Sequence, residues 1–166
     1  MLSYAQRVSA QAGGKIKRIA IASDHRGVAL KKELVRFLKN HNYRVKDFGP
    51  SSDVSCDYPL FGAKVASAVS RGDYQRGVLI CNSGIGMSMV SNKFRRVRAA
   101  LCKDMKIAKF SRLHNDANVL VLAAASTPVA KAKKILGVWL ATGFEGGRHA
   151  RRVEQIHVLE RKLFKC

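Results

Sequence analysis

The chain has 166 residues, of which 47% are hydrophobic and 25% are charged, and its 31 basic against 11 acidic residues give a formal net charge of +20. This length predicts one domain with a single core, and no apolar run approaches the roughly 20 residues of a membrane-spanning helix, which excludes a transmembrane segment. The charge favours anionic partners, but no zinc-finger, RNA-binding or basic-zipper pattern is present, so we expect no specific nucleic-acid binding.

The first 16 residues are predicted to form a flexible N-terminal extension. They include Arg7 and Lys15 but no acidic residue. An acid-poor start that contains Arg also resembles an organellar targeting segment, although this one is short and weakly amphipathic. Both interpretations stay open, and residues 17–166 are predicted to form the folded domain.

From residue 17 onward, apolar runs alternate with helical patterns, which is typical of βαβ units and a parallel sheet. The first predicted elements are a strand over 16–23, a helix over 27–39, a strand over 43–48, a helix over 58–70 and a strand over 77–81. They are followed by a helix over 86–93, a strand over 97–102, a helix over 105–113, a strand over 119–124 and helices over 128–140 and 147–159. The predicted fold class is α/β, a three-layer sandwich with a five-stranded, Rossmann-like parallel sheet in one domain.

The third predicted strand ends in an unusual turn, Cys81-Asn82-Ser83-Gly84-Ile85-Gly86. An apolar run stops there in a thiol, a hydroxyl and two glycines. Backbone N–H groups at such a turn, together with the positive end of the following helix, hold an anion or a developing oxyanion. The same field favours the thiolate form of Cys81.

Ligands of open parallel sheets bind beyond the carboxyl ends of the strands. Asp24 and His25 follow the first strand, Cys81 ends the third, and His114 and Asn115 precede the fifth. We expect all five to gather at one site. Each also has a structural interpretation, because Asp is a favoured helix cap, free Cys is commonly buried in cores, and a polar His-Asn pair suits a surface turn.

The last predicted helix has an apolar stripe opposite a basic side, which predicts packing on another surface such as a second subunit. Arg148 and Arg152 are four residues apart and share one side of this helix, where they could clamp a phosphate. A solvated basic face is the alternative.

The cysteines and histidines indicate neither disulfides nor a metal. Cys56, Cys81, Cys102 and Cys166 have no C-x-x-C spacing, which is typical of a reduced, cytoplasmic compartment. The five histidines form no paired-ligand motif, so no metal site is predicted.

Six motifs occur along the chain: Ala22-Ser23-Asp24-His25, Asp57-Tyr58-Pro59, Cys81-Asn82-Ser83-Gly84-Ile85-Gly86-Met87-Ser88, Asn92-Lys93, His114-Asn115-Asp116-Ala117-Asn118-Val119 and Gly146-Gly147-Arg148-His149. Through them, the chain resembles the ribose-5-phosphate isomerase B family, which includes the galactose-6-phosphate isomerase subunits. The resemblance implies a five-stranded parallel α/β sandwich, a C-terminal helix that helps to build a dimer, and active sites at the subunit interface. It also implies interconversion of an aldose phosphate and a ketose phosphate without cofactor or metal.

The resemblance assigns four catalytic residues. Cys81 would move the proton between C2 and C1 of the sugar, and Ser83 would handle protons on the substrate oxygens. His114 and Asp24 would assist opening of the furanose ring. One branch of the family uses a glutamate a turn after this cysteine, but Met87 occupies that position here.

The resemblance also assigns binding residues. The phosphate would be held by His25, Arg148 and Arg152. The sugar would be positioned by Tyr58 and Asn115. The enediolate would be stabilised by backbone amides around Asn82, Gly84 and Gly86.

Two departures from the family pattern affect the expected substrate. Asn82 stands where the family usually has glycine, and Ala125 stands where it usually has arginine. The predicted function is interconversion of ribose 5-phosphate and ribulose 5-phosphate, in the non-oxidative pentose phosphate pathway, by a homodimer or tetramer. The alternatives are isomerisation of a hexose 6-phosphate, such as galactose or allose 6-phosphate, and non-catalytic binding of phosphosugars or polyanions.

Overall fold

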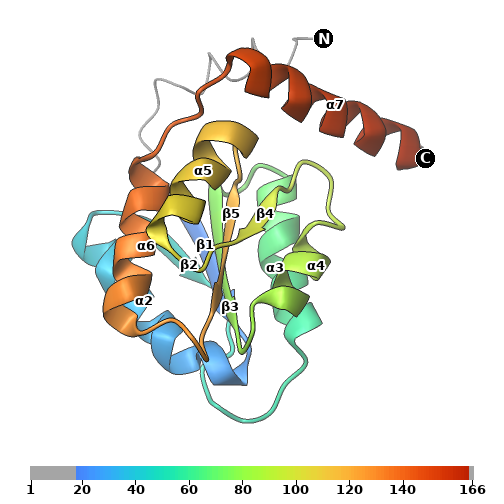
Figure 1. Cartoon of the computed structure of the whole chain (residues 1–166). Helices are drawn as coiled ribbons and strands as arrows, with labels where there is room; N and C mark the ends of the chain where they lie inside the picture. The colour runs from blue at the N-terminus through green and yellow to red at the C-terminus, as the bar shows by residue number, and fades with distance from the viewer. Residues whose placement is uncertain (1–17, 165–166) are drawn as a thin grey trace.

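The computed structural model describes residues 18–164, so the predicted extension 1–16 lies outside the described residues. Five parallel strands form one sheet in the order β2-β1-β3-β5-β4 (Figure 1). The strands are β1 Arg18–Ser23, β2 Arg44–Asp47, β3 Arg76–Cys81, β4 Ala99–Leu101 and β5 Val119–Ala123. The predicted five-stranded parallel sheet is confirmed. β4 is shorter than the predicted strand 97–102 and pairs only with β5 at the sheet edge.

Helices cover both faces of the sheet, as a three-layer sandwich requires (Figure 1). The helical elements are the 3-10 turn η1 His25–Gly27 and the helices α2 Val28–Asn40, α3 Tyr58–Ser70, α4 Ile85–Ser91, α5 Met105–Asn115, α6 Val129–Ala141 and α7 Gly147–Leu163. One buried cluster joins the sheet to α2, α5 and α6, and a second joins the opposite face to α3 and α4.

The two buried clusters follow from the alternation of side chains along the strands. In β1, Ile19 and Ile21 belong to one cluster, whereas Ala20 and Ala22 belong to the other. A strand that is buried on both faces reads as a continuous apolar run, and this is why the central strands were visible in the sequence. Helices therefore cover both faces of the sheet, and these layers leave only its two ends uncovered, where the strands begin and where they end.

α7 differs from the other helices because it crosses one end of the sandwich and extends away from it (Figure 1). Among the helices, α5 contacts it directly. Its apolar residues Ile156, Leu159 and Leu163 are 44%, 57% and 79% exposed. No helix within residues 18–164 is long and apolar enough to cross a membrane.

Gly77 allows α3 to pack closely on the sheet, and its replacement tests this packing. A Cβ atom there would lie 2.8 Å from Cγ1 of Val65 and 3.1 Å from Cγ2 of Val119. We expect Gly77→Ala to lower the free energy of unfolding by about 1–3 kcal/mol, measured by urea denaturation, because overpacking forces the layers apart. Gly137→Ala is the matched control, since its Cβ would meet only Phe37 at 3.9 Å. Equal stability of the two variants would contradict this account.

Candidate active site

Asp24 and Cys81 meet at the carboxyl edge of the sheet, where the strand order reverses between β1 and β3. Ser23 stands opposite Ile80 in the register, and the Asp24 N–H donates to the Ile80 carbonyl at 3.0 Å. Asp24 follows Ser23 and Cys81 follows Ile80, so both residues lie at the switch point. Ligands of such sheets bind at this point.

The Asp24 carboxylate ties the two loops at this edge together. Its Oδ1 atom accepts a hydrogen bond from the Gly27 N–H at 2.9 Å, and its Oδ2 atom accepts one from the Asn82 N–H at 3.2 Å. The side chain is 6% exposed. The helix-cap interpretation of Asp24 is thus confirmed for η1, and the same carboxylate also holds the loop that follows β3.

The Cys81 thiol lies inside a tight turn. The Gly84 N–H points at its sulfur with an N···S distance of 3.2 Å, and the residue is 4% exposed. Gly84 has a φ angle of +77°, and a Cβ atom there would lie 2.3 Å from Cδ1 of Leu101. Only glycine can therefore close this turn over the sulfur.

The neighbours of Cys81 are exposed and face outward from the turn. Ser83 accepts a hydrogen bond from the Ile85 N–H at 3.3 Å. The Asn82 carbonyl accepts from the Ala125 N–H at 3.1 Å, so the two positions that depart from the family pattern lie side by side. The amides of Asn82 and Gly84 are already engaged, by Asp24 and by the Cys81 sulfur.

Tyr58 and His25 flank this turn. Tyr58 begins α3, and its ring packs so closely on Gly86 that a Cβ atom there would lie 2.5 Å from the ring. The His25 Nδ1 atom accepts a hydrogen bond from the Cys56 N–H at 3.3 Å. We call Asp24, His25, Tyr58 and the turn from Cys81 to Gly86 the carboxyl-edge group.

The other predicted residues lie elsewhere, and the expectation that His114 and Asn115 join Cys81 within one chain is wrong. α5 connects β4 to β5, which are parallel, so it runs against the strands and ends at their amino edge (Figure 1). Consistent with this, Gly77 at the start of β3 donates its N–H to the Asn118 carbonyl, just after α5. We call His114, Asn115, Arg148, His149 and Arg152 the amino-edge group.

His114 lies in a stack of three rings at this amino edge. Its ring centroid is 4.9 Å from that of Phe110 and 4.3 Å from that of His149, and all three rings are nearly parallel. His149 is 5% exposed, and this burial lowers its pKa, with the nearby His114 as a further cause. Arg148 and Arg152 are exposed on the first turns of α7.

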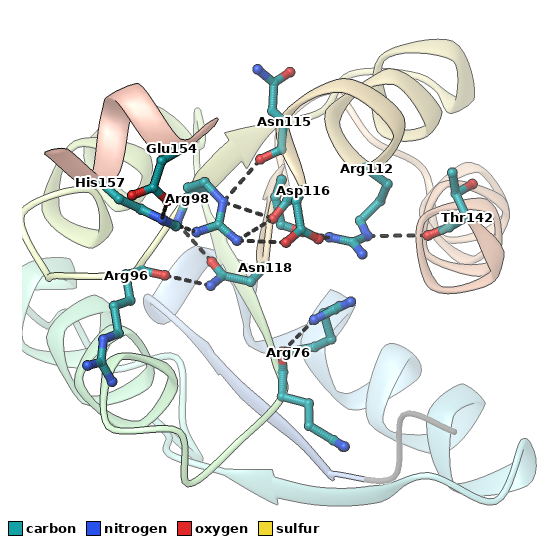
Figure 2. A network of polar contacts seen from close by, with 12 residues as sticks. Arg76, Arg96, Arg98, Arg112, Asn115, Asp116, Asn118, Thr142, Glu154 and His157 are labelled. Carbon is teal, nitrogen blue, oxygen red and sulfur yellow. Dashed lines mark hydrogen bonds and ion pairs between the residues drawn. The ribbon is translucent and has the colours of Figure 1, made fainter. Parts of the chain in front are cut away.

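A polar network fixes the end of α5, as Figure 2 shows. Asp116 adopts a left-handed conformation with φ 46°, and its carboxylate accepts from Arg112 at 2.6 Å and from Arg98 at 3.0 Å. Arg98 also donates to the Asn115 carbonyl at 3.0 Å and contacts His157 of α7 at 2.9 Å. The network therefore sets the positions of Asn115 and α7 relative to each other.

These positioning residues were not singled out from the sequence. The four-residue spacing of Arg112 and Asp116 is the signal that could have indicated an ion pair on one helix face. Nothing in the sequence brings Arg98 to this pair, because it precedes β4 and meets Asp116 only through the pairing of β4 with β5.

Comparison with known proteins agrees with this architecture. A model of the ribose/galactose isomerase family matches residues 19–156. The chain belongs to this family. Ribose-5-phosphate isomerase B of Escherichia coli K12 is 41% identical over 147 residues, which are 89% of this chain and 99% of that protein.

Solved structures of ribose/galactose isomerase family members share the fold. The ribose-5-phosphate isomerase B of Clostridium thermocellum is 46% identical, covers 88% of this chain and 99% of its own, and superposes with a TM-score of 0.86. The Mycoplasma genitalium enzyme, solved with bound ribulose 5-phosphate, is 41% identical, with 87% and 97% coverage and a TM-score of 0.85.

In this member of the ribose/galactose isomerase family, His157 makes stability depend on pH. Burial, and after it the neighbouring Arg98, lowers the pKa of His157 from its ordinary value of 6.5. The unfolded chain then binds a proton that the folded chain does not, so His157 favours the folded state fully above pH 6.5 and progressively less as the pH falls below it. We expect His157→Gln, which keeps an acceptor for Arg98, to reduce the loss of unfolding free energy between about pH 7 and 5. Guanidinium denaturation at a series of pH values measures this, and identical pH profiles would contradict it.

Proposed function

We propose that this chain is an aldose–ketose isomerase that interconverts ribose 5-phosphate and ribulose 5-phosphate. The observation that carries the proposal is the Cys81 sulfur, enclosed at the switch point between β1 and β3 with the Gly84 N–H directed at it. The names of the Escherichia coli and Clostridium thermocellum relatives and the ribulose 5-phosphate in the Mycoplasma genitalium structure support this substrate.

The reaction needs one base that serves two adjacent carbons. The Cys81 thiolate removes the proton from C2 of the open-chain aldose, and the electron pair moves to the carbonyl oxygen to form an enediolate. Cys81 then returns the proton to C1, and the Ser83 hydroxyl passes the proton between the two oxygens. The transfer needs no cofactor. The N–H groups of Asn82, Gly84 and Ile85 already have partners, so the N–H groups of Ser83 and Gly86 are the donors that stabilise the charge developing on oxygen.

The remaining roles are those that the family resemblance implies, and the positions of the side chains support them. Asp24 positions the turn through Asn82 and shares in opening the sugar ring with the lone pairs that its two hydrogen bonds leave. His25 faces the phosphate, and Tyr58 lines the sugar beside Gly86.

We further propose that the active site is completed by a second copy of the chain. The carboxyl-edge and amino-edge groups lie at opposite edges of one sheet, too far apart for a single pentose phosphate. In a homodimer, the partner would supply His114 for ring opening, Asn115 for the sugar, and Arg148 and Arg152 for the phosphate. Two-fold symmetry would then produce two equivalent sites.

The exposed apolar residues support such a dimer. Ile85 and Met89 on α4 are 52% and 64% exposed, beside the carboxyl-edge group. Near the amino-edge group, a groove between α7 and β4 is lined partly by Ile156, Leu159 and Leu163. Apolar contact is the attraction available to two chains that each carry a charge of +20.

A hexose 6-phosphate is the second candidate substrate, favoured by one observation. Ala125 has a short side chain at a position where the family usually carries arginine. The hydrogen bond from the Ala125 N–H to the Asn82 carbonyl makes these two residues neighbours. Because Asn82 and Ala125 both differ from the usual family residues, the space that they leave for the sugar differs too. Competition between ribose 5-phosphate and allose or galactose 6-phosphate decides between the two substrates.

The first test measures formation of ribulose 5-phosphate by the wild type in the presence of a chelator. We expect Cys81→Ala to lower kcat by about 10²–10⁴-fold, since it removes the proton-transferring base. Cys102→Ala is the matched control. Burial raises the pKa of that thiol to about 11, and Cys102 lies in the hydrophobic core directly after β4. Absence of turnover with pentose and hexose phosphates alike, combined with tight salt-sensitive polyanion binding, would favour the non-catalytic alternative.

A second test asks whether two chains share each site. Cys81→Ala and His114→Ala chains with different tags are co-expressed, and the mixed dimer is purified through both tags. We expect each pure variant to be impaired and the mixed dimer to regain about half of the wild-type activity, because one of its two sites has both groups intact. A mixed dimer as inactive as its parents would show that both residues act within one chain.

A further inference from the structure

We propose that His114, Glu145 and His149 form a binding site for a divalent transition-metal ion of the zinc type. One ligand atom from each of these residues lies within 4.8 Å of those of the other two. Two imidazoles and one carboxylate are a donor set that zinc uses in proteins, with water in the fourth position. The residues come from α5, from the loop before α7 and from α7 itself.

The buried nitrogen of His149 points to a missing ligand. Its Nε2 atom is inaccessible to solvent and has no hydrogen-bond partner among residues 18–164, and His149 as a whole is only 5% exposed. A buried ring nitrogen without a partner costs free energy, so native structures normally provide one. A metal ion held with His114 and Glu145 would satisfy this nitrogen.

Side-chain movements must bring the three ligand atoms closer together before they can hold an ion. The His114 Nε2 atom is 3.9 Å from the Glu145 Oε2 atom, whereas two ligand atoms of a tetrahedral zinc ion lie roughly 3.4 Å apart. The stacked His114 and His149 rings must also diverge so that their lone pairs converge on one point. His114 is 36% exposed and Glu145 is 54% exposed, so these two side chains can adjust around the buried His149.

Charge makes Glu145 the decisive ligand. Arg148 and Arg152 lie nearby on α7, and the chain carries +20 overall, which opposes the approach of a cation. Glu145 supplies the negative charge of the three-residue set. Its backbone N–H donates to the Leu113 carbonyl, so the loop stays anchored when the side chain is changed.

The consequence for activity rests on the proposed function. If His114 opens the sugar ring, a metal ion on its nitrogen removes it from the reaction, and zinc inhibits the isomerase reversibly. Binding of the metal does not depend on that role, so binding and inhibition are measured separately.

The experiment uses the full chain, stripped with a chelator and desalted. Zn²⁺ binding is measured by calorimetry, and zinc inhibition is measured with ribose 5-phosphate. We expect Glu145→Gln to weaken zinc binding by about 10–100-fold and to raise the half-inhibitory zinc concentration equally, without changing activity in the absence of metal. Asp73→Asn, which removes an exposed carboxylate from a distant loop, is the matched control and should bind zinc as the wild type does.

Cobalt spectra distinguish this site from a second possible metal-binding pair, Cys56 and His25. The Cys56 sulfur lies 4.0 Å from the His25 Nδ1 atom in the carboxyl-edge group. Co²⁺ at the proposed site should show visible d–d bands without the near-ultraviolet charge-transfer band of a thiolate ligand, and Cys56→Ser should leave the spectrum unchanged. A thiolate band, or zinc binding that is unaffected by Glu145→Gln, would overturn the proposed site. Binding that requires Glu145 but leaves turnover unaffected would overturn the inhibition and the catalytic role of His114, while the site would stand.

Discussion

A helix that joins two neighbouring parallel strands must run against them, and this requirement divides the polar residues of the chain between two edges of one sheet. α5 has 11 residues and spans about 16 Å, so its last turn lies that far from the carboxyl edge at which it begins. Cys81 and His114 therefore cannot share a small substrate within one chain. The proposed dimer and its two composite sites follow from this separation, and the exposed apolar side of α7 supplies a surface for the contact.

The two edges are held by different physical interactions. At the carboxyl edge, close backbone contacts at Gly84 and Gly86 and the carboxylate of Asp24 fix the turn around the thiol. At the amino edge, the charges of Asp116 and Arg112 are desolvated and paired. Breaking a buried pair is costly because one charge is left without a partner. Each arrangement fixes its side chains through several contacts at once, which is the preorganisation that the proposed site needs.

The acidic side chains are few, and several of them serve the fold. Asp47 pairs with Lys31, whose side chain is 1% exposed, and Asp116 pairs with two arginines. Each of these carboxylates is thus neutralised by a basic partner, and the excess of basic residues remains at the surface. This arrangement suits the attraction of a phosphorylated substrate, and it means that association of two chains must rely on apolar contact.

The sequence by itself determined the elements of the sheet and the nature of the Cys81 turn, because buried parallel strands read as apolar runs and tight turns require glycine at positions such as Gly84. It also indicated the family through short motifs whose residues are contiguous. Only the tertiary structure decided where His114 lies, how Arg98 meets Asp116, and that Glu145 and His149 surround His114. These relations join segments far apart in the chain, and the direction of a connecting helix and the pairing of strands, rather than local pattern, bring such segments together.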